Sequence, residues 1–178
     1  MTIWFTSDFH FNHDKEFIWK ERGFSSVGEM NDRIIERYNE VVKDDDEVYI
    51  LGDVMMGDRY AYIYEVLREL KGKKYLAYGN HCTNKRLEFF EEHKFFKDVQ
   101  MGYRIKQGKK TLLLTHYPTL VSNSTKDEVY NLHGHTHSTS VLSDIPKCIN
   151  VSVDAWNCYP ANIDEILEVI KNEKQRWN

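Results

Sequence analysis

The sequence has no long apolar run, no excess of basic charge and few cysteines. No window of about eighteen apolar residues occurs, so we expect no membrane-spanning helix and no membrane partner. Residues 1–8 lack a basic region and become acidic at once, which is untypical of a secretory signal peptide. The three cysteines, Cys82, Cys148 and Cys158, show no paired spacing and favour a reducing cytoplasm over a disulfide framework.

The charge balance bears on the kind of partner. The formal net charge of −4 argues against a protein that coats nucleic acid, so we expect no stable nucleic-acid complex. A small phosphate-bearing substrate remains compatible with this charge, because bound metal ions can supply local positive charge. The oligomeric state stays open.

Length and composition are those of an ordinary globular protein. The chain has 178 residues, of which 41% are hydrophobic and 29% charged. A chain of this size buries roughly 70% of the surface that its unfolded form exposes. We find no internal repeat, low-complexity tract or linker, so the sequence predicts a single domain over residues 1–178.

The first half alternates between strand and helix patterns. Apolar runs that we interpret as strands lie at residues 3–7, 47–51 and 74–78. Helical spacing of apolar residues lies between them, at 27–42 and 60–70, and Ser26-Val27-Gly28-Glu29 has the form of a capping box. This alternation predicts parallel strands whose carboxyl ends share one edge of a sheet. The run Lys43-Asp44-Asp45-Asp46 resembles a metal loop at first sight, but without a glycine or a closing glutamate it is better interpreted as a solvated loop.

The second half is richer in antiparallel patterns. A short helix is expected over 86–93, and a hairpin over 99–106 and 110–115 about Gln107-Gly108-Lys109. Further strands are expected at 129–132 and 148–153, and Asn162 precedes a final amphipathic helix. The predicted organisation is βαβαβ, then a mixed half, then a closing helix, which places the protein in the α/β (α+β) class.

Polar residues with metal-binding side chains follow almost every predicted strand. They are Asp8 and His10, Asp53, Asn80 and His81, His116, and the cluster His133, His135 and His137. At the carboxyl ends of strands in an open α/β sheet, such residues form ligand sites. Helix capping by Asn12 or Asp14 would explain part of the first group, and a histidine-rich loop would explain the last, but neither explains the whole series.

The order of these residues resembles the calcineurin-like metallophosphoesterases, in particular their small, uncapped bacterial and phage members. The family pattern is Asp-x-His, Gly-Asp, Gly-Asn-His, a lone His and Gly-His-x-His, and all of these blocks occur here between residues 8 and 137. The resemblance implies a four-layer αββα sandwich, in which two mixed β-sheets are flanked by helices.

The resemblance also implies a pair of divalent metal ions. Asp53 would bridge them, Asp8, His10 and His137 would complete one site, and Asn80, His116 and His135 would complete the other. Oxygen and imidazole ligands without thiolate suit ions of the Mn, Fe or Zn type, with Mn expected to serve in vitro. Two such ions activate a bridging hydroxide that attacks phosphorus in line with the leaving group.

Other residues are expected around this centre. His81 would stabilise phosphoryl charge or protonate the leaving group, although it could instead only cap the following helix. His13, Arg59 and Arg86 are candidates for substrate contact. Asp154 could orient a ligand imidazole, and His133 is expected to support the site without binding metal.

Departures from related patterns narrow the substrate. The arginines that grip phosphate in the Ser/Thr protein phosphatases of this superfamily are missing from Gly52–Arg59 and Tyr78–Cys82, and no insertion is long enough for a cap or DNA-gripping domain. We therefore expect a phosphoesterase of small molecules or nucleotides that prefers phosphodiesters. The alternatives are a phosphomonoesterase or nucleotide phosphohydrolase and, more remotely, a non-catalytic scaffold on the same fold.

Overall fold

The computed structural model describes residues 1–123 and 127–177, with only the backbone described for 174–177. Within these residues the first sheet has five strands in the order β4-β3-β2-β1-β9. Strands β1 to β4 are parallel, and β9 runs antiparallel to β1. Their bounds are Ile3–Thr6 for β1, Glu47–Ile50 for β2, Lys73–Ala77 for β3, Asp98–Gln100 for β4 and Ala161–Asn162 for β9.

The second sheet has four strands in the order β5-β6-β7-β8. Strand β5 is antiparallel to β6, whereas β6, β7 and β8 are parallel to one another, so this sheet is also mixed. The bounds are Tyr103–Gln107 for β5, Lys110–Leu114 for β6, Glu128–His133 for β7 and Cys148–Asn150 for β8.

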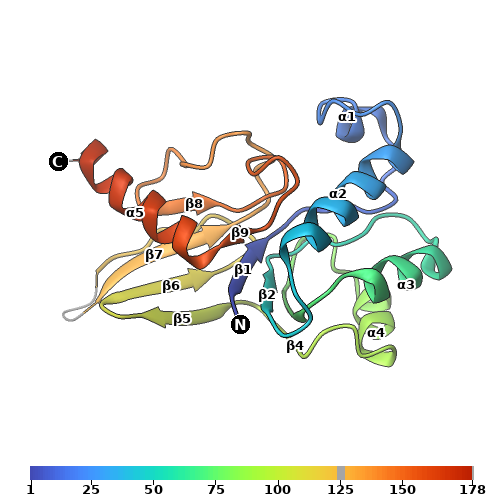
Figure 1. The fold of residues 1–178 in the computed structure, drawn as a ribbon, viewed down its shortest axis with the longest axis horizontal. Helices are drawn as coiled ribbons and strands as arrows, with labels where there is room; N and C mark the ends of the chain where they lie inside the picture. The colour runs from blue at the N-terminus through green and yellow to red at the C-terminus, as the bar shows by residue number, and fades with distance from the viewer. Residues whose placement is uncertain (124–126, 178) are drawn as a thin grey trace.

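Helices flank the two sheets. Helices α1 to α4 lie together beside the first sheet, and α5 lies on the other side of the molecule (Figure 1). Ser26 caps α2 by accepting a hydrogen bond from the Glu29 N–H, as the capping-box pattern predicts. The Asn162 side chain caps α5 in the same way. The helices are Glu16–Trp19 (α1), Val27–Val41 (α2), Tyr60–Glu69 (α3), Asn84–Glu92 (α4) and Ile163–Trp177 (α5).

Two hydrophobic cores hold these layers together. One lies between the first sheet and its helices and includes Ile34, Tyr38, Ile50, Ile63 and Leu67. The other joins the two sheets and α5, and includes Phe5, Leu51, Leu132, Ile149 and Ile166. Adjacent residues such as Ile50 and Leu51 enter different cores because successive side chains of an extended chain point to opposite faces. The predicted fold, two mixed β-sheets flanked by helices, is confirmed.

The predicted strand over 99–106 is wrong in one respect. It is divided into β4, which pairs with β3 in the first sheet, and β5, which pairs with β6 in the second. The chain crosses between the sheets at Met101-Gly102, where a Cβ on Gly102 would lie 2.6 Å from the Leu114 carbonyl oxygen. This close approach leaves room only for glycine and fixes the point of crossing.

The solvated loop expected at residues 43–46 is also only partly correct. Asp46 is 3% exposed, and its carboxylate accepts hydrogen bonds from the Thr2 N–H, the Trp4 indole and the Lys43 N–H. It therefore joins the amino-terminal strand to the loop before β2. Helix α1 and strand β9 were not predicted, because each is too short to carry a periodic signal.

Among the described residues, no helix combines the length and apolarity needed to traverse a bilayer. Cys82, Cys148 and Cys158 are all free thiols.

Candidate metal centre

The carboxyl ends of strands from both sheets converge on one group of polar side chains. The segments after β1 and β2 are joined by a hydrogen bond from the Asp8 N–H to the Gly52 carbonyl and by another from the His10 N–H to the Asp53 carbonyl. The segments after β6 and β7 are joined by a bond from the Gly134 N–H to the His116 carbonyl. Main-chain pairing therefore continues beyond the strands and positions the side chains that follow them.

The two buried carboxylates are oriented in the same manner. Asp8 Oδ2 accepts a hydrogen bond from the His135 N–H at 3.0 Å, and Asp53 Oδ1 accepts one from the His81 N–H at 2.9 Å. In each case one oxygen is fixed by the backbone of a different block. The other oxygen, Oδ1 of Asp8 or Oδ2 of Asp53, faces imidazole rings.

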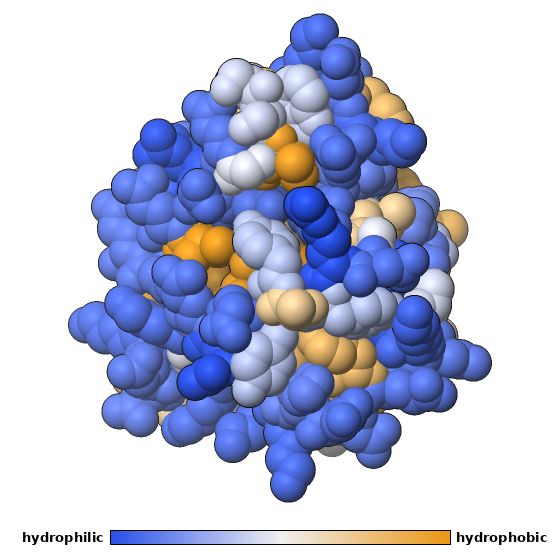
Figure 2. All heavy atoms as spheres, turned by 90° about the vertical axis from the view of Figure 1, so that its right-hand side faces the viewer, coloured by the Kyte–Doolittle hydropathy of each residue, from blue (hydrophilic) through white to orange (hydrophobic). Residues whose placement is uncertain are grey.

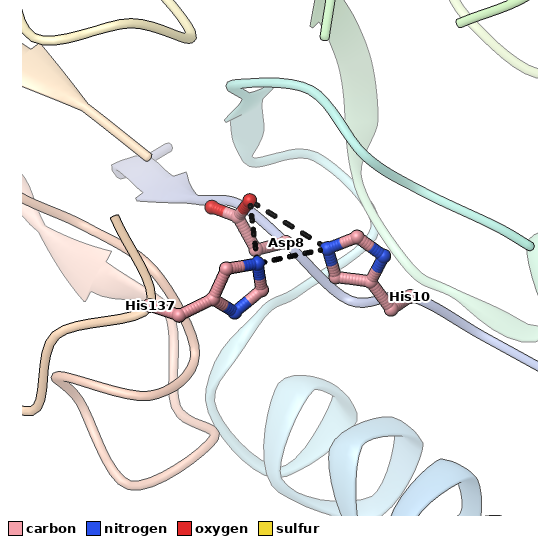
Figure 3. Close-up of side chains that lie close together, drawn as sticks. All are labelled: Asp8, His10 and His137. Atoms are coloured by element: carbon pink, nitrogen blue, oxygen red, sulfur yellow. Dashed lines mark hydrogen bonds and ion pairs between the residues drawn. The ribbon is translucent and has the colours of Figure 1, made fainter. Parts of the chain in front are cut away.

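The first group of donors is Asp8, His10 and His137, whose side chains point toward one another (Figure 3). The two Nε2 atoms of the histidines are 3.1 Å apart. Asp8 Oδ1 lies 3.8 Å from each of them. Asp8 and His10 follow β1 and His137 follows β7, so this group joins the two sheets.

The second group is Asn80, His116 and His135. Asn80 Oδ1 lies 2.7 Å from His116 Nε2 and 2.9 Å from His135 Nδ1. Asp53 stands between the two groups, because its Oδ2 is 3.7 Å from His10 Nε2 and 3.5 Å from His116 Nε2. The seven candidate ligands expected from the sequence are therefore brought together as two sets that share one carboxylate oxygen.

The hydrogen bonding of this cluster fits divalent cations. His137 Nδ1 donates to Asp154, and His116 Nδ1 donates to the Leu51 carbonyl, so the Nε2 atom of each neutral ring carries a lone pair. Those lone pairs face His10 Nε2 and Asn80 Oδ1, so nitrogen and oxygen donors converge in a way that suits a bound cation. Asp8 Oδ1 has no hydrogen-bond partner among the described residues. Burial lowers the pKa of His10 to about 2, whereas at His137 burial is outweighed by the hydrogen bond to Asp154 and by the charges of Asp8 and Asp154, which raise its pKa.

Backbone strain is concentrated at the same residues. Left-handed φ angles are uncommon for residues other than glycine, and they persist where the surrounding structure imposes them. Five of the candidate ligands have such angles: Asp8 (59°), His10 (50°), Asp53 (50°), His135 (69°) and His137 (49°). The turns that follow the strands therefore direct these side chains inward at a conformational cost.

Two motif glycines allow the carboxylates to approach. A Cβ on Gly79 would contact Asp53 Oδ1 and would lie 2.6 Å from the Asp53 nitrogen. A Cβ on Gly134 would collide with Asp8 Oδ2 and Ser7 Oγ. Any larger residue at either position would displace a carboxylate of the cluster.

Asp154 contacts His137, as expected, but it also has a partner that the sequence does not reveal. Arg22 donates to both oxygens of Asp154, at 2.8 and 3.0 Å, and to the carbonyls of Asp8 and Phe9. Burial alone would raise the pKa of Asp154, but the hydrogen bond from His137 and the charge of Arg22 hold that pKa well below its usual range. Arg22 lies in an ordinary charged stretch, and no local pattern distinguishes it.

His81 and His13 border the cluster. The side chain of His81 is 36% exposed, and its Nε2 lies 3.9 Å from Asp53 Oδ2. The His81 and His13 rings each have their centroid 5.4 Å from that of His10. Both rings therefore reach the open side of the site. His133 is instead fully buried, with Nδ1 donating to the Gly134 carbonyl.

The two arginines expected to meet substrate differ in how far they are engaged. Arg86 donates to the carbonyls of His81 and Gly57, so its guanidinium supports the loops that border the site. Arg59 is exposed, and its one hydrogen bond among the described residues is a 3.5 Å contact with Asn12 Oδ1. Figure 2 shows the face of the molecule that carries the helices. The surface of this face is mostly hydrophilic, and its apolar patches are small and separated.

Comparisons with known proteins identify the family. The sequence model described as calcineurin-like phosphoesterase matches residues 1–169. The uncharacterized protein MJ1445 of Methanocaldococcus jannaschii is 34% identical over 97% of this chain and 93% of its own length. The Gene 66 protein of Mycobacterium phage L5 is 28% identical over 95% of this chain and 94% of its own.

Solved structures show the same fold. The protein of unknown function AQ665 from Aquifex aeolicus matches with a TM-score of 0.75 and 24% identity, over 94% of this chain and 98% of its own. A structure described as a novel archaeal phosphodiesterase matches with a TM-score of 0.50 and 14% identity, over 92% and 99% of the two chains. The match to the family over residues 1–169 shows that this chain belongs to the calcineurin-like phosphoesterases.

Proposed function

We propose that the protein is a binuclear metal-dependent phosphoesterase that prefers phosphodiesters and acts in the cytoplasm. One observation carries the proposal: two sets of oxygen and imidazole donors share the Oδ2 atom of Asp53. A single carboxylate oxygen between two donor sets is the arrangement that holds two cations close together despite their repulsion.

The contacts support two ligand sets. Asp8, His10 and His137 would hold one ion and Asn80, His116 and His135 the other, with Asp53 common to both. Mixed oxygen and imidazole donors suit Mn, Fe or Zn, and we take Mn²⁺ as the ion for assays. When bound, such ions polarise a phosphoryl group and lower the pKa of water enough for it to attack at neutral pH.

The protein's own groups complete the reaction. His81 is partly exposed and stands beside Asp53, so it is placed to donate a proton to the departing oxygen of a substrate held at the cluster. Asp154 and Arg22 keep His137 in the tautomer whose Nε2 lone pair faces the cluster. His13 borders the same opening and is placed to contact the substrate.

A preference for diesters is supported by the charges around the site. A monoester dianion carries more charge than a diester and is held best by several cations. Arg86 is committed to backbone carbonyls, and Lys15 and Arg59 line a hollow that contains none of the seven candidate ligands, so little fixed positive charge faces the cluster itself. A diester, with one negative charge, needs less.

The test is hydrolysis of two model esters by Mn²⁺-loaded protein. We expect faster turnover of bis(p-nitrophenyl) phosphate than of p-nitrophenyl phosphate. The reverse order would establish a phosphomonoesterase. A protein that remains inert on both esters with Mn, Fe, Co, Ni and Zn would contradict the proposal and favour a non-catalytic scaffold.

A further inference from the structure

A hollow of about 470 Å³ lies beside the candidate metal centre and has basic side chains in its wall. It is lined by Asn12, His13, Asp14, Lys15, Met56, Gly57 and Arg59, so its wall holds two cations and one carboxylate. His13 connects it to the cluster, because the same ring lies 5.4 Å from that of His10. His13 therefore borders both the cluster and this hollow.

Neither cation of the hollow forms an ion pair within the described part of the chain, although Asp14 lines the same hollow. None of the ion pairs among the described residues includes Lys15 or Arg59. Other nearby cations are occupied, since Arg86 donates to two carbonyls and Lys85 lies over the Tyr60 ring. In a chain with a net charge of −4, a hollow with two cations and one carboxylate keeps an excess of positive charge that is available for an anion.

An aromatic side chain borders the site nearby. Phe17 is 62% exposed, although large apolar side chains are usually covered, and its ring meets that of His13 edge to face at 5.6 Å. It lines a second hollow of about 230 Å³ together with Ile18, Arg22 and His137. Exposed aromatic rings beside phosphate-binding groups are typical platforms for stacking a nucleobase.

From these features we infer that the hollow formed by His13, Lys15 and Arg59 is a subsite for a second phosphate, and that the substrates are nucleotides bearing a phosphate besides the scissile one. The nucleobase lies against Phe17. This inference rests on the proposed function only in placing the scissile phosphate at the metal centre. The second phosphate gains charge-assisted hydrogen bonds from Lys15 and Arg59.

The test is calorimetric titration of Mn²⁺-loaded protein with thymidine 5′-monophosphate and thymidine 3′,5′-bisphosphate, with equal Mn²⁺ in cell and syringe. We expect the bisphosphate to bind about ten-fold more tightly, as charge-assisted bonds of ordinary strength would give. The advantage should shrink at high salt, because the subsite is exposed. Equal affinities for the two nucleotides would overturn the inference.

Variants locate the effect. Arg59→Gln and Lys15→Gln should each reduce the ratio of the two affinities, and the double variant should bring it near one. Lys171→Gln removes an exposed cation on α5 and serves as the control, which should keep the wild-type ratio. A wild-type ratio in the double variant would refute the subsite.

Two further comparisons test the nucleotide assignment. Phe17→Ala should weaken binding of both nucleotides by a similar factor and leave their ratio unchanged. Fructose 1,6-bisphosphate, which has no base, should bind less tightly than the nucleoside bisphosphate. Equal binding of the two bisphosphates, or no effect of Phe17→Ala, would overturn the assignment to nucleotides.

Hydrolysis of bis(p-nitrophenyl) phosphate by the same preparations separates the inference from the proposed function. If the ester is hydrolysed but the bisphosphate has no advantage, the subsite is wrong and the function stands. If the ester is not hydrolysed but the advantage exists and disappears in the double variant, the subsite stands and the function is wrong.

Discussion

The guanidinium of Arg22 is bonded to both carboxylate oxygens of Asp154, through Nε at 2.8 Å and Nη2 at 3.0 Å. The same Nη2 donates to the carbonyl of Asp8, and Asp154 in turn accepts from His137. One buried cation thus fixes the backbone at one candidate ligand and the ring of another, although the residues lie far apart in the chain.

Substitutions of Arg22 or Asp154 should weaken metal binding, although neither residue is a candidate ligand. We expect Asp154→Asn and Arg22→Met each to weaken Mn²⁺ binding by about 10–100-fold, the range typical of groups that orient a metal-binding histidine. Affinity is measured by calorimetry, and the absorption spectrum of the Co²⁺-loaded protein reports the altered ligand geometry. Arg22→Lys should lose less Mn²⁺ affinity than Arg22→Met, because lysine keeps the positive charge beside Asp154.

Asp45→Asn, at an exposed acid in the loop before β2, is the matched control. If Arg22→Met binds Mn²⁺ and shows the Co²⁺ spectrum of the wild type, then Arg22 plays no part in positioning His137.

Asp53→Asn should abolish turnover and lower the number of bound ions. The amide keeps an oxygen for the His81 N–H but removes the charge that two cations would share. We expect activity on bis(p-nitrophenyl) phosphate to fall by more than about 100-fold, a larger loss than for groups that only orient a ligand. Metal content is measured by atomic emission after dialysis, and circular dichroism of the metal-free variant checks folding. Wild-type rate and metal content would show that Asp53 is not the bridge.

His81→Gln should separate proton donation from metal binding. General acids commonly contribute about 10²–10⁴-fold to rate. We expect a large loss on thymidylyl-thymidine, whose alkoxide leaving group needs a proton, and a smaller one on bis(p-nitrophenyl) phosphate. Metal content should be unchanged. Equal losses on both substrates would indicate that His81 stabilises phosphoryl charge instead.

Asp46 gives a pH-dependent prediction away from the metal centre. Although burial by itself raises the pKa of this carboxyl, the hydrogen bonds from Thr2, Trp4 and Lys43 hold the pKa below its usual value. A lowered pKa in the folded state stabilises the fold above the ordinary carboxyl pKa of about 4, and that contribution is lost as the pH falls below it.

The variant Asp46→Asn should therefore lower the free energy of unfolding by about 1–3 kcal/mol at pH 7, the usual effect of impairing buried hydrogen bonds to a charged group. The difference from the wild type should shrink in acid. Urea denaturation of metal-free protein at pH 7 and at lower pH measures both. A difference that grows in acid would mean that folding raises the pKa of Asp46 instead of lowering it.

The convergence of the candidate ligands was predictable because it depends on a local rule. Asp8, Asp53 and Asn80 each follow a strand of a βαβ series, and parallel strands place their carboxyl ends at one edge. Arg22 was not predictable, because its partner Asp154 is 132 residues away and nothing near Arg22 in the sequence indicates the contact.

The misplaced elements have similar causes. The chain's passage from β4 to β5 depends on the contact between Gly102 and Leu114, which belongs to the packing of the second sheet and not to the local pattern. Asp46 looks solvated in sequence because its donors Thr2 and Trp4 come from the amino-terminal strand. Both the crossing from β4 to β5 and the burial of Asp46 therefore depend on contacts between residues far apart in the sequence.

Each donor set draws on both sheets, with Asp8, His10 and Asn80 from the first and His116, His135 and His137 from the second. The candidate metal centre therefore lies between the two sheets, and an ion bound there would cross-link the two halves of the molecule. Separation of the sheets would break up both proposed sites at once, so ions bound there would stabilise the packed sheets against opening. On the proposed assignment, removal of the ions would lower the free energy of unfolding as well as the activity.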